Sequence, residues 1–220
     1  MKEFIEKRAN SGSISHRKLI LGVGVNDAWY MTQVKDSDGV KSYCPYYTKW
    51  SGMLTRCYSK KYQKRQPTYV GCSVCTEWLI FSTFRKWMET QDWKGKQLDK
   101  DILVKGNKVY SPDTCVFVSK GLNVTFKDWS RVRGKYPQGV SLSRQGKYVV
   151  KCNANGVRTR LGTYSCVKQA EIAYCTHKIK VLTELSKQTE AEAHEALKAA
   201  ILNEAQMMSE RVKEISAFSC

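Results

Sequence analysis

The segment from Tyr136 to Lys187 constrains the fold most, because its pattern predicts three short strands followed by one helix. Side chains alternate between the two faces of a strand, so Arg158 and Arg160 are expected to share a face. The same period places Lys147 and Lys151 together on the second strand, and Ser141 with Ser143 on the first. The sequence therefore predicts a small sheet with a basic face, backed by a helix.

Positive charge is concentrated in this region rather than spread along the chain. The 220 residues carry a net charge of +17, and residues 130–187 hold twelve Lys and Arg against two acidic residues. Residues 1–129 hold 22 against twelve, and residues 188–220 hold three against six. Positive charge that is concentrated in one region indicates that the protein binds a polyanion, and nucleic acid is the most common one. The alternative is a basic protein that binds no polyanion, and the charge distribution favours it less.

The sequence as a whole predicts four regions. Residues 1–18 are polar and predict a flexible arm, and residues 19–129 mix short strands with two helices, at 48–59 and from an N-cap at Thr76. Residues 130–187 form the basic module, reached through a linker at 127–135. Residues 188–220 predict an acidic amphipathic helix that packs on the module or mediates self-association. The expected fold class is α+β.

Cysteine usage and hydropathy predict a cytoplasmic protein. Nine cysteines, an odd number, are scattered through core-like patterns, which favours free thiols over disulfides. No apolar run has the length of a membrane span, and residues 1–13 lack the apolar core of a signal peptide. Cys72 and Cys75 form a CxxC without a second pair, so the spacing does not favour a zinc site.

Residues 20–126 resemble phage HNH homing-endonuclease-like proteins. The resemblance depends on the order and spacing of aromatic and strand segments, which are Trp50 to Tyr58, Val74 to Phe84, Leu98 to Val118 and Asn123. It implies a ββα fold in which a metal ion assists DNA cleavage. An HNH site uses a histidine as general base, yet no histidine lies between His16 and His177. The HNH motif is therefore degenerate.

Two interpretations of the degenerate motif remain open. In one, Asp99 and Asp101 hold Mg²⁺, Asn107 or Asp113 assists, and the chain is a metal-dependent endonuclease. In the other, the domain contacts DNA without cutting it, and no cofactor is needed.

Residues 136–187 resemble the DNA-binding domain of plant ethylene-response (apetala-type) factors, which also occurs in phage homing endonucleases. The residues that carry this resemblance are Gly139, Val140, Gly146 to Tyr148, Arg158, Arg160, Leu161 to Tyr164 and Gln169 to Tyr174. Ala170 and Ala173 are small enough to let the helix lie close to the sheet. The resemblance implies that the sheet enters the major groove of DNA.

The predicted function is binding of double-stranded DNA by a phage or mobile-element protein. The expected contacts come from Arg144, Lys147, Lys151, Arg158 and Arg160. Arginine can bind guanine with two hydrogen bonds, so Arg158 and Arg160 are the predicted base readers, whereas Lys147 and Lys151 are predicted to contact phosphate. The alternatives are an HNH-like endonuclease that uses Asp99 and Asp101, and an RNA-binding or inhibitor protein.

Overall fold

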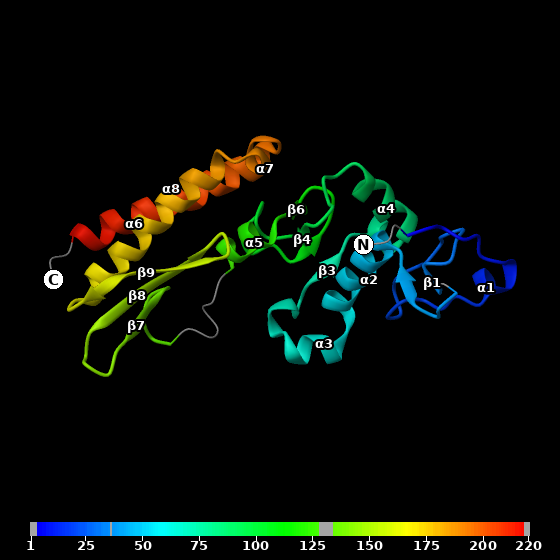
Figure 1. Ribbon diagram of the computed structural model, residues 1–220, viewed down its shortest axis with the longest axis horizontal. Coiled ribbons are helices and arrows are strands. Elements are labelled where there is room, and N and C mark those ends of the chain that lie inside the picture. Colours follow the sequence, from blue (N-terminus) through cyan, green and yellow to red (C-terminus); the bar gives the residue numbers. More distant parts are fainter. Residues whose placement is uncertain (1–3, 36, 128–133, 218–220) are drawn as a thin grey trace. The chain divides into compact units, whose positions relative to one another are not determined.

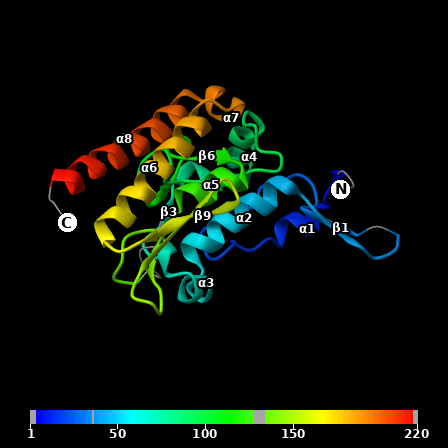
Figure 2. The ribbon, with the colours of Figure 1, turned by 60° about the vertical axis from the view of Figure 1, so that its left-hand side comes forward.

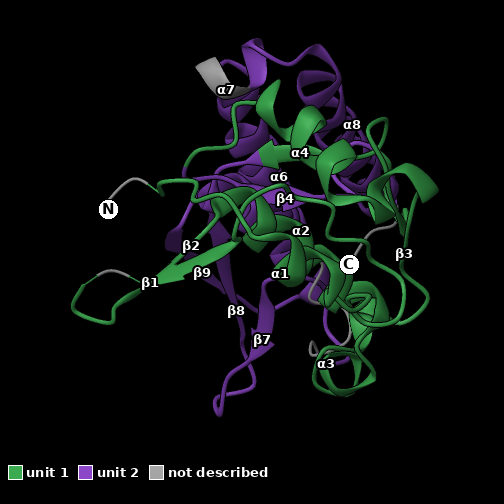
Figure 3. Ribbon diagram, turned by 90° about the vertical axis from the view of Figure 1, so that its right-hand side faces the viewer, with its two compact units in different colours: residues 1–94, 104–117 green, residues 95–103, 118–220 purple. Residues whose placement is uncertain are grey.

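The computed structural model describes residues 4–35, 37–127 and 134–217 (Figure 1). The chain divides into two compact units (Figure 3). Unit 1 comprises Met1–Lys94 and Val104–Phe117, and unit 2 comprises Gly95–Leu103 and Val118–Cys220. The units do not follow the predicted limits, because residues 95–103 and 118–127 join the basic module instead of the N-terminal region.

Unit 1 combines short helices with two small two-stranded sheets. Its helical segments are α1 (Ser11–Ser15), α2 (Pro45–Tyr58), α3 (Lys60–Arg65), η1 (Pro67–Tyr69), η2 (Thr76–Leu79) and α4 (Phe81–Glu89). Strands β1 (Gln33–Lys35) and β2 (Lys41–Tyr43) pair antiparallel, whereas β3 (Ser73–Val74) and β5 (Val109–Tyr110) pair parallel.

Aromatic side chains at helical spacing build the core of unit 1. Trp50, Trp78, Phe81 and Phe84 are almost fully buried, and Trp50 Nε1 donates a hydrogen bond of 2.7 Å to the carbonyl of Trp78. Thr76 is not the cap of a long helix, because residues 76–79 form a 3₁₀ turn and α4 begins only at Phe81. The aromatic residues are therefore core residues.

The N-terminal segment differs from the flexible arm that its polar composition predicts. The backbone N–H of Ala9 donates to the carbonyl of Trp29 at 3.1 Å, and that of Met31 donates to Lys7 at 2.9 Å. Arg17 donates to the carbonyl of Tyr30 at 2.9 Å. Residues 7–17 are therefore fixed to the rest of unit 1 by hydrogen bonds of the backbone and of the Arg17 guanidinium, which composition does not reveal.

Unit 2 is built on a three-stranded antiparallel sheet with the order β7-β8-β9. The strands are β7 (Val140–Leu142), β8 (Tyr148–Ala154) and β9 (Val157–Tyr164). The helices are α5 (Lys120–Phe126), α6 (Val167–Ser186), α7 (Thr189–Glu192) and α8 (Glu195–Ala217). The short strand β4 (Gln97–Asp99) also belongs to unit 2, and β6 (Val116–Val118) lies at the boundary of the units.

Helix α6 covers one face of this sheet, and α8 runs back along α6 (Figures 1 and 2). Val150, Cys152, Ala170 and Tyr174 form the core between sheet and helix. Met208 and Val212 of α8 pack against the same core. Packing of the C-terminal helix on the module, one of the two predicted alternatives, is therefore observed.

The α+β class, the three-stranded antiparallel sheet and the C-terminal helix are confirmed. The predicted ββα arrangement of the N-terminal domain stays a prediction, because β4 and α5 belong to unit 2 while β5 belongs to unit 1. In the described part of the chain, no helix has the length and apolar character needed to cross a membrane.

Candidate nucleic-acid interface

The sheet of unit 2 has one face packed on α6 and one face that no helix or strand of the described residues covers. Along β8, Val150, Cys152 and Ala154 are buried toward α6, whereas the alternating Lys151 and Asn153 are exposed. This alternation is the pattern of an antiparallel sheet with one solvated face. We call the solvated side the open face.

The strand register places the predicted DNA contacts on this open face. Lys151 lies opposite Arg160 on β9, and Asn153 lies opposite Arg158. Ser141 of β7 lies opposite Val149 of β8 on the same face. Between Tyr136 and Ala170 the sequence contains no Asp or Glu, so the three strands place no acidic side chain on the open face.

A β-bulge lies in the middle of β9. The register shifts between Val150 and Lys151, where Val150 pairs with Gly162 and Lys151 pairs with Arg160, so Leu161 is the extra residue. Leu161 packs on the core while Arg160 and Thr163 lie on the open face. Arg160 donates a hydrogen bond of 3.0 Å to Oγ1 of Thr163. The bulge therefore places Arg160, which precedes it, and Thr163, which follows it, on the same face of the sheet.

The remaining predicted contacts lie at the end of the β7–β8 hairpin. The N–H of Ser143 donates to the carbonyl of Lys147 at 2.8 Å, and the N–H of Lys147 donates to Oγ of Ser143 at 3.2 Å. Arg144 and Lys147 are exposed in this turn. Among the described residues, no carboxylate forms an ion pair with Arg144, Lys147, Lys151 or Arg158.

Gly139 allows the start of β7 to approach α6. Its φ of +76° belongs to the left-handed region, and an added Cβ would lie 2.3 Å from Tyr174 and 2.5 Å from the carbonyl oxygen of Lys151. The neighbouring carbonyl of Gly139 accepts a hydrogen bond of 2.8 Å from the N–H of Lys151. Only glycine fits this position without displacing a strand that bears the open face.

Helix α5 docks on the turn between β8 and β9, a contact that the sequence did not reveal. Thr125 Oγ1 accepts a hydrogen bond of 2.8 Å from the N–H of Asn155 and donates one of 2.9 Å to Gly121. The buried Nζ of Lys178 donates to the carbonyl of Thr125. Burial lowers the pKa of Lys178, an effect that the nearby Cys152 and Glu204 oppose. These contacts join α5, α6 and the sheet into one unit.

The predicted metal ligands Asp99 and Asp101 lie at and just after the end of β4. Asp99 Oδ1 accepts hydrogen bonds from the N–H groups of Asp101 and Ile102, at 2.8 and 2.9 Å. Asp101 forms an ion pair of 3.1 Å with the buried Lys100. Burial, followed by the charge of Asp101, raises the pKa of Asp99 to about 6. Asp99 thus caps a turn, and Lys100 pairs with Asp101.

The structure does not bring Asn107 together with the two aspartates in one unit. Asn107 lies in unit 1, where its side-chain amide donates to the carbonyl of Val109 at 2.7 Å and accepts from its N–H at 3.1 Å. Asn107 therefore closes a local turn. Within the described ranges, no three His, Cys, Asp or Glu side chains are grouped so that they could hold a metal ion.

The cysteines that the structure describes show no metal-binding arrangement either. Seven of them are free thiols, namely Cys44, Cys57, Cys72, Cys75, Cys115, Cys152 and Cys175. Cys166 differs from the prediction of free thiols, because it is disulfide-bonded. Cys72 is buried, and burial raises the pKa of the Cys75 thiol, which disfavours the thiolate that a metal ion would need.

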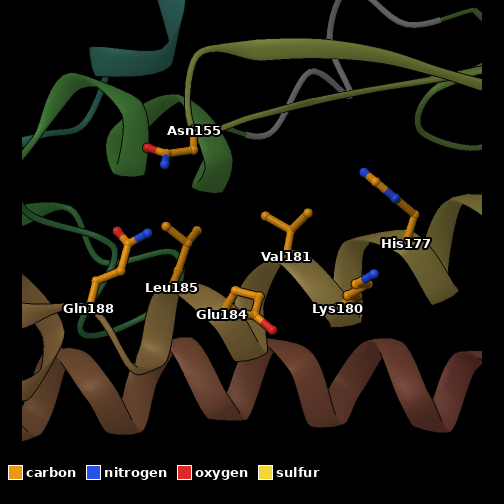
Figure 4. A pocket seen from close by; sticks show the side chains of 7 residues that line it. All are labelled: Asn155, His177, Lys180, Val181, Glu184, Leu185 and Gln188. Atoms are coloured by element: carbon orange, nitrogen blue, oxygen red, sulfur yellow. The ribbon is translucent and has the colours of Figure 1, made fainter.

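A hollow of about 210 Å³ lies between α6 and the β8–β9 turn (Figure 4). Figure 4 shows Asn155 on the side of the turn, and His177, Val181 and Leu185 projecting from α6. Its lining combines a cation, Lys180, with an anion, Glu184, and apolar groups. The hollow lies on the side of the sheet that α6 covers, so it is separate from the open face.

Comparisons of the chain with protein-family models, with curated proteins and with solved structures find no match. A proposal for the function therefore depends on the geometry of unit 2.

Proposed function

We propose that the chain binds double-stranded DNA through the open face of the β7-β8-β9 sheet. The observation that carries the proposal is the register, which sets Arg160 opposite Lys151 and Arg158 opposite Asn153 on one uncovered face. A two- or three-stranded sheet can enter the major groove, where arginine recognises guanine and asparagine recognises adenine. Arg158 and Arg160 are the base readers in this proposal, and Lys147, Lys151 and Arg144 bind phosphate.

The composition of the open face supports duplex DNA over single-stranded RNA. Proteins that bind single-stranded RNA through a sheet stack bases on exposed aromatic rings. Here Tyr148 and Tyr164 pack against the core under α6. The open face is therefore suited to hydrogen bonds and charge rather than to stacking.

Binding of the full chain to duplex DNA tests the proposal. Arg158→Ala combined with Arg160→Ala is expected to weaken binding by at least tenfold, since each arginine contributes about 1–3 kcal/mol of base discrimination. Lys180→Ala combined with Lys187→Ala is the charge-matched control, because both lysines are exposed, Lys180 on α6 and Lys187 at its C-cap, on the side of the helix behind the sheet. Equal affinity of the arginine variant and the control would refute the proposal. Competition by single-stranded RNA identifies the preferred nucleic acid.

The endonuclease alternative stays a prediction, and the turn-capping role of Asp99 gives it no added support. A plasmid nicking assay with Mg²⁺ or Mn²⁺ distinguishes the two functions. Nicking that is lost in an Asp99→Ala/Asp101→Ala variant would assign cleavage to these residues, whereas binding without nicking leaves recognition as the function.

A further inference from the structure

A second basic surface lies in unit 1, on helix α3 (Figure 1). Lys60, Lys61, Lys64 and Arg65 are all exposed. Residues spaced by four lie one turn apart, so Lys60 pairs with Lys64 and Lys61 with Arg65 on one side of the helix. We call these four residues the α3 cationic face. The sequence contains no Asp or Glu between Asp38 and Glu77, so no acidic residue interrupts it along this stretch.

The opposite side of α3 is fixed to the rest of unit 1. The side-chain amide of Gln63 donates to the carbonyls of Arg56, Cys57 and Tyr69, at 3.2, 2.6 and 3.2 Å. Ser59 caps the helix by accepting a hydrogen bond of 3.2 Å from the N–H of Tyr62. These contacts satisfy carbonyls at the end of α2 and set the rotation of α3. The α3 cationic face therefore has a defined orientation toward solvent.

This arrangement of charge opposes folding. Like charges one turn apart destabilise a helix by about 0.2–0.5 kcal/mol per pair. Lys60 and Lys61 also lie in the first turn, where the helix dipole disfavours cations, although Lys64 and Arg65 in the last turn are favourable. Arg65 lies over the ring of Tyr62 at 5.8 Å, and among the described residues none of the four cations has an acidic partner. An anionic ligand would offset this repulsion.

We propose that the α3 cationic face binds the phosphate backbone of duplex DNA, as a contact additional to the sheet of unit 2. The identity of the polyanion rests on the proposed function, whereas the surface itself does not. The six residues of α3 span about 9 Å of helix axis. Duplex DNA presents one phosphate charge per about 1.7 Å, so that length offers about five charges to four cations. Such a contact strengthens binding without reading sequence.

The dependence of affinity on salt tests this inference, with a mixed-sequence DNA duplex as the probe. Each phosphate contact adds about 0.9 to the slope of log affinity against log salt concentration. Replacement of Lys60, Lys61, Lys64 and Arg65 by Gln in the full chain is expected to lower this slope by about 2–4. The control replaces four exposed lysines elsewhere in unit 1 by Gln, namely Lys18, Lys35, Lys41 and Lys86. It removes the same charge and is expected to lower the slope by less than about 1.

A variant with only two substitutions distinguishes the loss of a DNA contact from a folding defect. Lys60→Gln combined with Lys61→Gln relieves repulsion in the first turn, so it is expected to fold at least as well as the wild type and to lower the slope by about half as much. An unchanged slope in both α3 variants, or an equal change in the control, would overturn the inference. A change seen only with single-stranded RNA would overturn it as well.

The outcome is separable from that of the proposed function. If the Arg158→Ala/Arg160→Ala variant binds duplex DNA as the wild type does while the α3 variants lose affinity, the sheet proposal fails and the α3 contact stands. If only the arginine variant loses affinity, the sheet proposal stands and the α3 contact fails.

Discussion

Arg160 donates a hydrogen bond of 3.0 Å to Oγ1 of Thr163, although three positions separate the two residues along one strand. In a regular strand, residues three apart lie on opposite faces. The bulge at Leu161 reverses the alternation, so both side chains lie on the open face of the sheet. Thr163 therefore holds the guanidinium of Arg160 in one orientation on the open face.

Removal of the threonine hydroxyl is expected to relax base preference without changing the charge. In a Thr163→Val variant, Arg160 keeps its position but loses a hydrogen bond worth about 0.5–1.5 kcal/mol. We expect discrimination at one base position to fall by about threefold to tenfold, while the salt dependence stays the same. Selection from a randomised duplex library measures this preference, and an unchanged preference would show that Thr163 does not orient Arg160.

Lys151 and Arg158 are expected to contribute to DNA binding in different ways. Lys151→Ala should weaken binding equally for all sequences and lower the salt slope by about 0.9, because a phosphate contact is lost. Arg158→Ala should also cost about 1–3 kcal/mol of discrimination at one base pair. Affinities for a selected site and for a scrambled site, each over a range of salt concentrations, separate the two effects. The same site-to-scramble ratio in both variants would contradict the assignment.

Gly139→Ala is expected to destabilise unit 2. The added methyl group would meet the backbone of Lys151 and the ring of Tyr174 at a residue whose φ is positive. We expect a loss of at least about 2 kcal/mol in the free energy of unfolding. Gly146→Ala is the matched control, because Gly146 has a φ of +74° but no atom within 4 Å of an added Cβ. Equal losses in chemical denaturation would assign the cost to backbone strain alone.

Local pattern was sufficient to predict the three strands of the basic module and the two long helices of unit 2, but not α5 or α7. Period-two alternation places Arg158 and Arg160 on one face of the third strand and Lys147 and Lys151 on one face of the second, and helical spacing identifies α6 and α8. The bulge at Leu161 was not predicted, because it depends on how β9 pairs with β8. The end of β4 at Asp99 was not predicted either, because the hydrogen bonds by which this carboxylate caps a turn do not show in the pattern.

Contacts between distant segments could not be derived from local pattern. The hydrogen bonds of Thr125 with Asn155 and Lys178 join residues 30 and 53 positions apart. Thr125 carries no spacing signal, and Lys178 in a helix predicts a solvated side chain. The pair Asp99 and Asp101 fits either a metal site or a capped turn in the sequence, and only backbone geometry shows the hydrogen bonds of the turn. The α3 cationic face is different, because its run of lysines is visible in the sequence.

Asp99→Asn is expected to stabilise the protein in a pH-dependent manner. The pKa of Asp99 is raised to about 6 in the folded state, against about 3.9 in an unfolded chain. Between these values the folded state holds one more proton than the unfolded state, so the free energy of unfolding falls as pH rises. Asparagine keeps the oxygen that accepts the N–H groups of Asp101 and Ile102 but cannot ionise. The variant should therefore match the wild type below about pH 4 and exceed it by about 1–3 kcal/mol above about pH 6.

Urea denaturation from about pH 4 to about pH 8 measures the difference between Asp99→Asn and the wild type. Asp113→Asn is the control, because it removes one exposed carboxylate that lies outside unit 2. A difference that is the same at every pH would show that Asp99 ionises as in the unfolded chain. A variant that is less stable than the wild type at neutral pH would show that the charged carboxylate is needed where Asp99 caps the turn. That result would favour a bound cation at this position.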